Sequence, residues 1–298
     1  MVNWMMGRLI NMAPAQVKRF VAPERLLRNR YLASKQLPLG ALEGRFVVER
    51  STSHEDAPIP PSDLWEGYGK TPEEYLDSGR RHVTQMMQNL AAHGATTPMT
   101  RVLEFGCAAG RMLRFVPRPP GSDFWGVDIK ANTIAWCQQH LAPLQFATTT
   151  TYPHLPFEDN YFDLVFAGSV FTHIADLPDA WFLELRRVLR PGGYAYVTVI
   201  DPDSVRRFQA DAINGELDWW MNPMKEWDQE TGFLNSPRLG MCSFEAGSWG
   251  GFPVPQVVYD LGYLQEKWGR WAEPLGVCRF AYDGQHAVIF RKHQRPVA

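Results

Sequence analysis

The stretch 102-VLEFGCAAGRMLRF-115, together with 124-FWGVDIK-130, decides the fold of this chain. In each segment a short apolar run ends in an acidic residue, Glu104 in the first and Asp128 in the second. The first run continues into a loop that contains two glycines. Short apolar runs that end in polar loops are typical of buried parallel strands, whose carboxyl ends meet at one edge of a sheet. We therefore expect the two acids to lie close together beside a bound ligand.

Strand-like and helical segments alternate between residues 101 and 200. The strand-like runs are RVLEF, FWGVDI, LQFATT, FDLVFA and YAYVTVI, and the helical segments lie around 110–116, 132–141 and 177–189. Near-continuous apolar strands separated by helices predict an α/β fold with a Rossmann-like, doubly wound, mostly parallel sheet covered on both faces. Beyond a helix expected over 260–271, two further strands at 277–282 and 286–291 are joined by Asp283-Gly284, a hairpin signal.

A helix is predicted over residues 71–94, before the first strand. Thr71 serves as its N-cap, Pro72 takes the first helical position, Glu74 completes a capping box and Gly94 ends it. We expect this helix to lie over the entrance of the site. That position would bring Arg80 and Arg81 near the ligand, although both also fit a solvated helix surface.

The flanking segments suggest how the chain is organised. Residues 1–60 are basic and contain several prolines, so we expect 1–95 to form an N-terminal extension with a helical cap. Residues 96–298 would form the main domain. Within it the alternating pattern lapses, and we expect an inserted lid over the acceptor at about 201–255.

Composition excludes several classes of protein. The 298 residues carry a formal charge of −2, which gives no reason to expect a nucleic-acid partner. The four cysteines form no CxxC pair, so a metal knuckle or a disulfide framework is not expected. No apolar run is long enough to span a membrane, and residues 1–12 make a poor signal peptide. These features predict a cytoplasmic protein.

The N-terminal segment leaves two interpretations open. Residues 1–50 carry nine Lys or Arg against three Glu, a net charge of about +6. Trp4, Leu9 and Ile10 with the neighbouring arginines could form an amphipathic helix at a membrane surface. A helix packed on the main domain is the interpretation that we favour.

The loop at Gly106–Gly110 differs from a phosphate-binding loop. A dinucleotide fold would place G-x-G-x-x-G here, but this loop reads G-x-A-x-G and follows Glu104. A carboxylate beside the loop repels phosphate and suits a cation, and Asp128 can accept the two hydroxyls of a ribose. The ligand implied is a nucleoside with a positively charged, non-phosphorylated tail. Alternatively, the glycines make only a tight turn and both acids are solvated strand ends.

These residues resemble the class I S-adenosylmethionine-dependent methyltransferases. The first motif of that family looks like Glu104–Gly110, and the second like the acid in GVDIK. The third and fourth regions resemble 155-LPFEDNYFDLVFAGSVFTHI-174 and 185-LRRVLRPGGYAYVTV-199. The resemblance covers about residues 100–200 and implies S-adenosylmethionine as the cofactor. The helix and hairpin at the end of the chain match the reversed last strand of that fold.

The resemblance also implies a role for individual residues. Glu104, Gly106, Ala108, Gly110 and Arg111 would surround the amino-acid part of the cofactor, Asp128 would bind its ribose, Ile129, Thr150 and Thr151 would lie around adenine, and Gly168 and Ser169 would lie beside the sulfonium. Two positions depart from the family pattern. Ala108 replaces the central glycine, and Thr151 stands where many relatives have an acid. No metal site is expected, because Gly168 and Ser169 occupy the place of its acidic ligand.

His173 is the candidate catalytic base. It follows the fourth strand at the ligand-facing edge, and a neutral histidine has suitable basicity for removing the proton of a hydroxyl acceptor. The alternative is that His173 only packs against a loop and caps a backbone carbonyl. Asp201 and Asp203 are alternative bases or turn formers, and His154 is expected to be structural. Arg111 could pair with an anion or lie on a solvated helix surface.

The acceptor is expected to be a small molecule or a glycan that is methylated on a hydroxyl oxygen. Trp219, Trp220, Trp227 and Trp249 of the expected lid could stack on it, or could form the small core of an irregular insertion. Two other functions remain open: a catalytically weak cofactor-binding partner subunit, and an oxidoreductase on the same type of sheet. The sequence indicates no oligomeric state.

Overall fold

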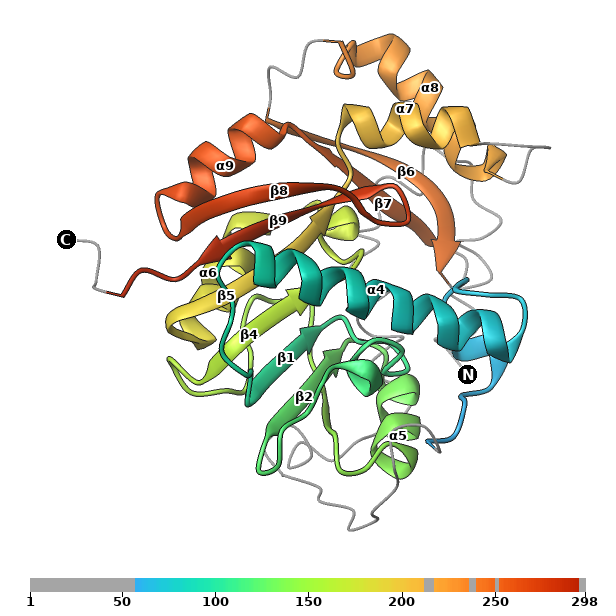
Figure 1. Ribbon diagram of the computed structural model, residues 1–298. Helices are drawn as coiled ribbons and strands as arrows, with labels where there is room; N and C mark the ends of the chain where they lie inside the picture. Colours follow the sequence, from blue (N-terminus) through green and yellow to red (C-terminus); the bar gives the residue numbers. More distant parts are fainter. Residues whose placement is uncertain (1–56, 212–216, 236–239, 250–251, 295–298) are drawn as a thin grey trace, which may run out of the picture.

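The computed structural model describes residues 57–211, 217–235, 240–249 and 252–294. The expectations for residues 1–56, including the membrane-surface helix, lie outside this part of the chain. Seven strands form one sheet in the order β3-β2-β1-β4-β5-β9-β8 (Figure 1). Their bounds are β1 Arg101–Phe105, β2 Asp123–Asp128, β3 Gln145–Thr148, β4 Phe162–Ala167, β5 Leu189–Val199, β8 Glu273–Tyr282 and β9 Gln285–Arg291.

The sheet is mostly parallel, with a reversed last strand. The five strands β1 to β5 pair in parallel, whereas β9 pairs antiparallel with both β5 and β8. The hairpin turn between β8 and β9 falls at Asp283-Gly284, where Gly284 has a φ of 90°. The predicted Rossmann-like, doubly wound fold and the predicted hairpin are therefore confirmed.

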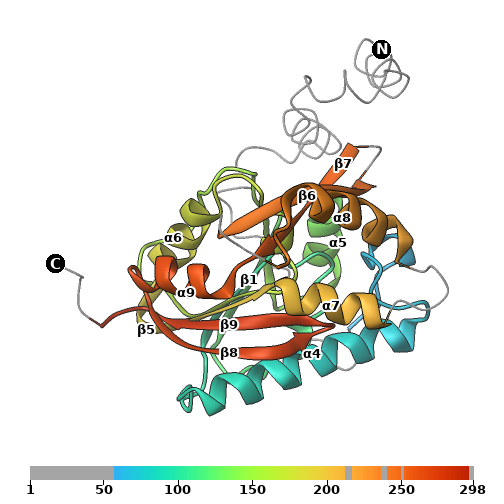
Figure 2. The same ribbon diagram turned by 90° about the horizontal axis from the view of Figure 1, so that it is seen from above.

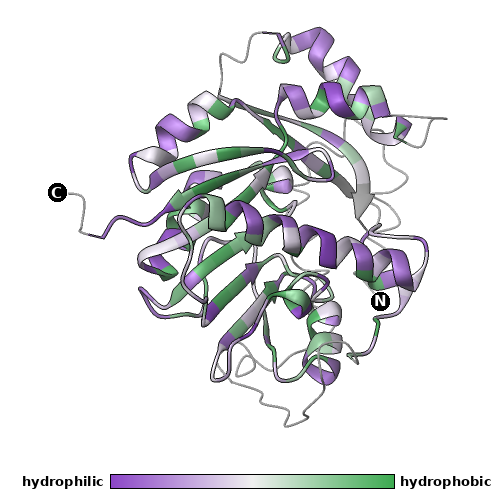
Figure 3. Cartoon of the chain, in the orientation of Figure 1, coloured by the Kyte–Doolittle hydropathy of each residue, from purple (hydrophilic) through white to green (hydrophobic). Residues whose placement is uncertain are grey.

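Helices cover both faces of the sheet, as Figure 2 shows in the view from above. The helices α4 (Pro72–Ala92) and α5 (Ala131–His140) pack on one face. The helices α6 (Pro178–Val188) and α9 (Leu261–Gly269) pack on the other. Alternate residues of each strand enter the two layers, so that Val102 faces α4 while Leu103 faces α6. Burial on both faces explains the near-continuous apolar strands, which are green in Figure 3.

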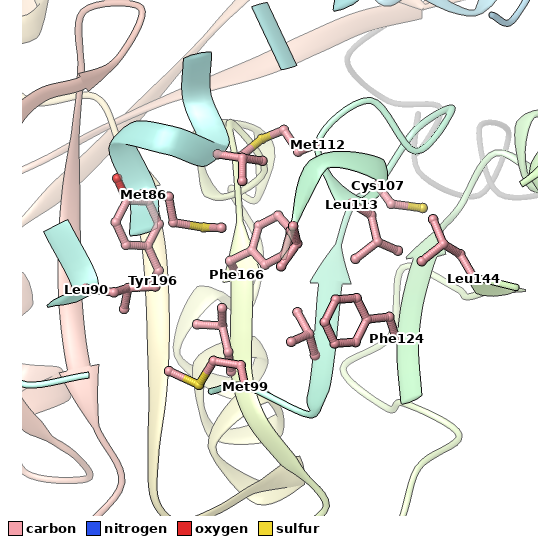
Figure 4. Close-up of a cluster of buried hydrophobic side chains, with 14 of the residues drawn as sticks. Met86, Leu90, Met99, Cys107, Met112, Leu113, Phe124, Leu144, Phe166 and Tyr196 are labelled. Carbon is pink, nitrogen blue, oxygen red and sulfur yellow. The ribbon is translucent and has the colours of Figure 1, made fainter. Parts of the chain in front are cut away.

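The layer beneath α4 is a tightly packed apolar cluster. Met86 and Leu90 of α4 are fully buried against Phe166 and Tyr196 of the sheet (Figure 4). The start of α4 follows the predicted cap, because Thr71 accepts a hydrogen bond from the Glu74 backbone N–H at 3.2 Å. The Glu74 side chain accepts from Lys70 N–H rather than from the cap residue itself. Packing and capping together place this helix along the sheet face.

The segment 110–116 does not form the predicted α-helix. It contains turns and a short 3-10 helix, η4, at Leu113–Phe115. An α-helix would need the Leu113 N–H to donate to the carbonyl four residues earlier. Instead, this N–H donates to the buried Glu104 carboxylate at 2.9 Å. At this position a side-chain acceptor therefore takes the place of the backbone acceptor of an α-helix.

The segment after β5, hereafter the lid, has regular structure. It consists of α7 (Pro202–Asp211), α8 (Asp218–Thr231) and a two-stranded hairpin of β6 (Met241–Trp249) and β7 (Phe252–Tyr259). Figure 1 shows these elements gathered beyond the arrowheads of β1 and β4. The lid has an apolar cluster of its own, which includes Trp220, Met224 and Phe244. In the part of the chain that the structure describes, no helix combines the length and the apolar character needed to cross a membrane.

Candidate active site

A cavity of about 1080 Å³ opens where the carboxyl ends of β1, β2 and β4 meet the lid. Nine of the predicted site residues line it: Gly106, Ala108, Asp128, Ile129, Thr150, Thr151, Gly168, Ser169 and His173. This position is the one at which ligands bind in open α/β sheets, because β1 and β4 lie side by side with their connections on opposite faces. The tertiary structure thus brings together residues that are up to 67 positions apart in the sequence.

Three predicted residues lie behind this cavity. Glu104 and Arg111 line a small adjoining void of about 30 Å³ that shares Gly106, Ala108 and Gly168 with the cavity. Gly110 lines neither space. Its φ of 69° and the approach of Leu141 to within 2.6 Å of an added Cβ explain why glycine stands there. In this structure Gly110 therefore shapes the turn and has no surface on the cavity.

Glu104 is a buried acid with one strong partner. Its side chain is 4% exposed and accepts the hydrogen bond from the Leu113 N–H. Burial raises the pKa of this carboxyl to about 8 because the ionised form has lost its solvation, and the charge of Arg111 opposes that rise. The alternative of a solvated strand end is therefore wrong for Glu104. A cation placed in the adjoining void would favour the ionised carboxylate.

Asp128 accepts hydrogen bonds that hold the loop at Gly106–Gly110 in place, and Asp128 also lines the cavity. One carboxylate oxygen accepts from the Ala108 N–H and the other from the Lys130 N–H, both at 2.9 Å. The carboxylate can accept further hydrogen bonds at each oxygen, as binding of a ribose requires. Ala108 has a φ of 43°, a left-handed conformation that suits the glycine found in the family pattern. The alanine thus adopts the backbone shape of the residue that it replaces.

Gly106 and Gly168 allow two close approaches. A Cβ on Gly106 would lie 2.3 Å from Val170, and a Cβ on Gly168 would lie 2.8 Å from Tyr282. Both glycines line the cavity, so a ligand can reach the backbone at these points. Val170 belongs to the segment after β4, and Tyr282 ends β8. The two glycines let separate parts of the chain meet at the cavity wall.

Arg111 is buried, which contradicts the solvated helix-surface interpretation. Its side chain is 5% exposed and donates to Ser78 at 3.1 Å and to the hydroxyl of Tyr282 at 2.6 Å. The guanidinium also lies 3.8 Å from the ring centre of Tyr68, a cation–π contact. Nδ1 of His82 lies 3.1 Å from the Arg111 nitrogen that donates to Ser78. Arg111 therefore ties α4 and β8 to the back of the loop.

His173 lies in η5 (Phe171–His173) and faces the cavity. Its Nδ1 is 3.1 Å from the carbonyl oxygen of Pro255 in the lid. A carbonyl only accepts, so Nδ1 carries the proton, and Nε2 is the nitrogen at which the neutral ring can take up another. Burial lowers the pKa of His173, with Lys130 acting in the same direction and the Pro255 contact opposing it. The ring is thus held in its neutral form, with a defined tautomer, near neutral pH.

Ser169 is held beside Gly168 by a polar network. Its backbone N–H donates to Thr198 at 2.7 Å, and its hydroxyl accepts from Gln285 at 2.7 Å. Thr198 in turn donates to Gln285 at 2.8 Å, so the three residues close a ring of hydrogen bonds. Ser169 has a φ of 56°, which is uncommon for a residue with a side chain. The reversed strand β9 therefore supports the cavity wall through its first residue, Gln285.

Sequence reasoning missed much of the cavity wall, including four residues with polar side chains. Glu66, Tyr68, Thr149 and Gln256 all line the cavity. Thr149 is 4% exposed, and its buried hydroxyl has no hydrogen-bond partner in the structure. It is the neighbour of the predicted Thr150 and could have been found from the run of threonines. Glu66 and Tyr68 lie in 65-WEGYGK-70, whose aromatics and glycines mark a loop just before the capped helix.

The helix α4 does not lie over the cavity, contrary to expectation. The structure describes all of α4, and none of its residues lines the cavity. The turn before it takes that place, with Glu66 in an ion pair with Lys130 across the wall. Arg80 pairs with Asp77 at 2.9 Å, and Arg81 pairs with Asp283 at 2.8 Å. The buried face of α4 packs on the sheet, so its arginines point to solvent.

Asp201 and Asp203 also lie outside the cavity wall. Asp201 caps α7 by accepting from the Ser204 N–H at 2.8 Å, and it lies 3.0 Å from Nε2 of His286. A carboxylate oxygen of Asp201, a carboxylate oxygen of Asp203 and a ring nitrogen of His286 all lie within 4.8 Å of one another. However, Asp203 pairs with two arginines, and Nδ1 of His286 accepts from the Phe280 N–H. These groups serve the packing of α7 against the β8–β9 hairpin.

The tryptophans of the lid divide between the two expected roles. Trp220 is 5% exposed and donates to Gln256 at 3.1 Å, and Trp227 packs in the same cluster, so both support the core of the lid. Trp219 lines the cavity and is 54% exposed. The side chain of Trp249 lies outside the described residues. His154, expected to be structural, is exposed, with an 81% exposed side chain.

Comparisons with known proteins agree with this geometry. A family profile described as a methyltransferase domain matches residues 103–197. The chain is 31% identical over 240 residues to the uncharacterized methyltransferase C1B3.06c of Schizosaccharomyces pombe, which covers 65% of this chain and 85% of that protein. It is 32% identical over 124 residues to sterol 24-C-methyltransferase erg6 of the same yeast, which covers 39% of this chain and 32% of that protein.

A solved structure shows the same fold. The PH0226 protein from Pyrococcus horikoshii OT3 aligns with a TM-score of 0.50 and 19% identity over 72% of this chain and 90% of that one. The chain spans about a third of the length of the sterol methyltransferase. The likeness to that relative thus covers only part of each protein.

Proposed function

This chain belongs to the class I S-adenosylmethionine-dependent methyltransferases, and we propose that it transfers the methyl group of this cofactor to a hydroxyl oxygen of a small-molecule acceptor. The observation that carries the proposal is the placement of Asp128, the glycine loop and His173 on one cavity wall. The family uses S-adenosylmethionine, which supplies an activated methyl group. An in-line transfer depends mainly on alignment of the two reactants and on exclusion of water.

The residues present fit this cofactor. Asp128 would accept hydrogen bonds from the ribose hydroxyls, and Thr149 would lie on the adenine side of the wall. The close approaches at Gly106 and Gly168 leave backbone open to the ligand. Glu104, behind the loop, would become ionised beside an ammonium group because a nearby cation stabilises its charged form. Ile129, Thr150, Thr151 and Ser169 complete the proposed cofactor site.

His173 supports oxygen as the acceptor atom. A hydroxyl must lose its proton as its oxygen gains the methyl group, and Nε2 of His173 can accept that proton. The bond to Pro255 keeps the imidazole in the tautomer that this step requires. The positive charge that leaves the cofactor is then matched by the charge gained on the imidazole. The relative named for sterol 24-C-methylation shows that the family likeness itself does not specify the acceptor atom.

Two measurements test the proposal. Calorimetry with S-adenosylmethionine and with S-adenosylhomocysteine should show binding in the micromolar range without added metal. Incubation with labelled S-adenosylmethionine and a cell extract, followed by mass spectrometry, should reveal a methyl ether. Absence of heat with both ligands, together with binding of a nicotinamide dinucleotide, would contradict the assignment. Binding without any methylated product would favour the catalytically weak partner subunit instead.

A further inference from the structure

The acceptor side of the cavity is apolar. It lies between the lid hairpin, which contributes Ala246, Val254 and Pro255, and the segment that carries Val170 and Ile174. Among the charged residues of the wall, Asp128 and Lys130 lie at the end of β2, Glu66 lies in the turn before α4, and Asp176 is exposed beside Leu177. At about 1080 Å³ the cavity exceeds the roughly 300–1,000 Å³ of a pocket for one drug-sized ligand. It has room for an acceptor beside the cofactor.

Two polar groups on this side already have partners within the protein. The Gln256 amide oxygen accepts from Trp220 at 3.1 Å, and its nitrogen donates to the Ala246 carbonyl at 3.3 Å. His173 uses Nδ1 on Pro255. A glycan carries many hydroxyls, each of which must find a partner when it leaves water. The hairpin part of this wall, at Ala246, Val254 and Pro255, offers no polar side chain to a sugar hydroxyl.

Three exposed apolar side chains surround the cavity mouth. Tyr152, Leu177 and Trp219, hereafter the apolar rim, are 56%, 58% and 54% exposed and all line the cavity. They come from the loop after β3, the start of α6 and the start of α8. Water-exposed apolar side chains that gather at a cavity mouth indicate a surface for an apolar ligand or partner.

Leu177 occupies its position at a cost to stability. It is the N-cap of α6, where Ser, Thr, Asp or Asn would satisfy a backbone N–H, and its own side chain makes no such bond. It also has a φ of 56°, a conformation that favours glycine or asparagine. Neither helix formation nor burial explains leucine here. Backbone strain at a cavity mouth points to a role in ligand binding.

Trp219 packs against the lid hairpin. Its ring lies on Gly247 of β6, where an added Cβ would come within 2.9 Å of the indole. Gly247 has a φ of 71° and falls within the irregular register between Glu245 and Ser248. The hairpin thus leaves space for the indole at the mouth while the ring remains half exposed.

We propose that the acceptor is an amphiphile, with its hydroxyl at His173 and an apolar body that runs along the lid hairpin and leaves across the apolar rim. This inference rests on the proposed methyl transfer and names its acceptor class. The apolar body gains by burying hydrocarbon against Val254 and Pro255, and the rim covers the part that does not fit inside. The His173 end receives the polar group.

Binding to protein saturated with S-adenosylhomocysteine tests the acceptor class. The probe is the neutral fluorophore N-phenyl-1-naphthylamine. The competitors are 1-alkanols of six to twelve carbons and, separately, methyl glucoside. The alkanol affinity should rise roughly fourfold per methylene, from about 0.8 kcal/mol for each buried CH₂. Methyl glucoside should not displace the probe. Displacement by the glucoside in place of the alkanols would overturn the proposal in favour of a glycan.

Rim variants test the route across the mouth. The Leu177→Ala and Trp219→Ala double variant should bind decanol at least tenfold more weakly than the wild type. Leu183→Ala, an exposed leucine of the same helix α6 that does not line the cavity, should leave decanol binding unchanged. Equal decanol affinity in the rim variant would overturn the proposed route. Calorimetry with S-adenosylhomocysteine comes first, because its failure would contradict the methyltransferase function and not the acceptor class.

Discussion

At the scale of single residues, burial acts on two titratable groups of the site. It raises the pKa of Glu104 to about 8 and lowers that of His173. Both shifts favour the neutral side chain near pH 7, because a buried charge loses its solvation. For Glu104 this leaves an acid that can ionise when a cation binds. For His173 it leaves a base that is ready to accept a proton.

Replacement of His173 tests its role as the base. Activity of the wild type should rise with pH through a pKa below the ordinary value of 6.5 and then stay level, because only the neutral ring accepts a proton. His173→Gln should lose about 10²–10⁴ in kcat and lose this acid limb. Steady-state rates from pH 5 to 9 provide the measurement. His154→Gln, at an exposed position, should keep the wild-type profile. A fully active Gln variant with an unchanged profile would show that His173 is only structural.

Glu104 should make the stability of the ligand-free protein depend on pH. Its carboxyl titrates near 4.5 in the unfolded chain and near 8 in the folded protein. The stabilisation from the protonated acid is therefore complete below pH 4.5 and is lost as the pH rises through 8. Glu104→Gln keeps a neutral side chain at every pH and should remove this loss.

Urea unfolding at pH 5 and pH 8 measures the effect. The free energy of unfolding should fall by on the order of a few kcal/mol more in the wild type than in Glu104→Gln, since one pKa unit corresponds to about 1.4 kcal/mol. Glu226→Gln, at an exposed position of α8, should behave as the wild type does. An equal fall in all three proteins would mean that Glu104 is ionised in the folded state.

At the scale of elements, the loop after β1 depends on the end of β2. The Ala108 N–H donates to Asp128, and the N–H groups of Gly106 and Cys107 donate to the Val127 carbonyl at 2.8 and 3.0 Å. Leu113 is held by Glu104, at the end of β1 itself. Groups at the ends of β1 and β2 therefore accept hydrogen bonds from the N–H groups of the loop. In an α-helix, backbone carbonyls of the helix would accept them. The loop is shaped before any ligand arrives.

Asp128 should contribute both to cofactor binding and to the order of the loop. Asp128→Ala should weaken S-adenosylhomocysteine by about 1–3 kcal/mol, the cost of leaving donors without a charged acceptor. Asp128→Asn keeps one acceptor oxygen and should lose less. Calorimetry provides the affinities, and circular dichroism should show that both variants are folded. Asp211→Ala, at an exposed position of α7 that does not line the cavity, is the matched control. An Asp128→Ala protein that is folded and has unchanged affinity would remove Asp128 from the site.

At the scale of the whole molecule, the lid has an apolar cluster of its own, and its strand β7 also adds Val257 and Tyr259 to one core layer of the sheet. Two apolar layers share the seven-stranded sheet, whereas the lid cluster surrounds Trp220. The strand β7 joins the lid to the sheet domain through the Tyr259 N–H, which donates to the Ile200 carbonyl at 2.8 Å. It also carries Pro255, the partner of His173. The position of the lid therefore determines how the proposed base is held.

Loosening the lid core should impair methyl transfer and spare the cofactor. Trp220→Ala removes a buried ring that packs against Phe244 at 5.3 Å between ring centres, at a cost of about 3–5 kcal/mol within the lid. Hydrogen exchange should become faster in 241–249 and 252–259 and remain unchanged in β1 and β4. Affinity for S-adenosylhomocysteine should change less than threefold. Lys225→Ala, at an exposed position of α8, should leave exchange unchanged. Faster exchange in β1 as well would show that lid and sheet unfold as one unit.

Much of the fold could be predicted because it depends on local patterns. The apolar runs became β1, β2, β4 and β5, the capped segment became α4, and Asp283-Gly284 became the hairpin turn. A strand buried on both faces requires an apolar side chain at nearly every position, and a helix start requires a cap, so both leave a trace in neighbouring residues. The acids at the strand ends and His173 followed from the same pattern.

The sequence by itself determined the parallel sheet, its reversed last strand and the strand-end residues that line the cavity. Only the tertiary structure decided that 110–116 is not an α-helix, that Arg111 is buried, and that the turn with Glu66 and not α4 lines the cavity. It also decided which tryptophan of the lid faces the cavity. Each of these outcomes depends on a partner distant in sequence, such as Tyr282 for Arg111 or Gly247 for Trp219. Such contacts form between surfaces that meet only when the chain has folded, so no local pattern records them.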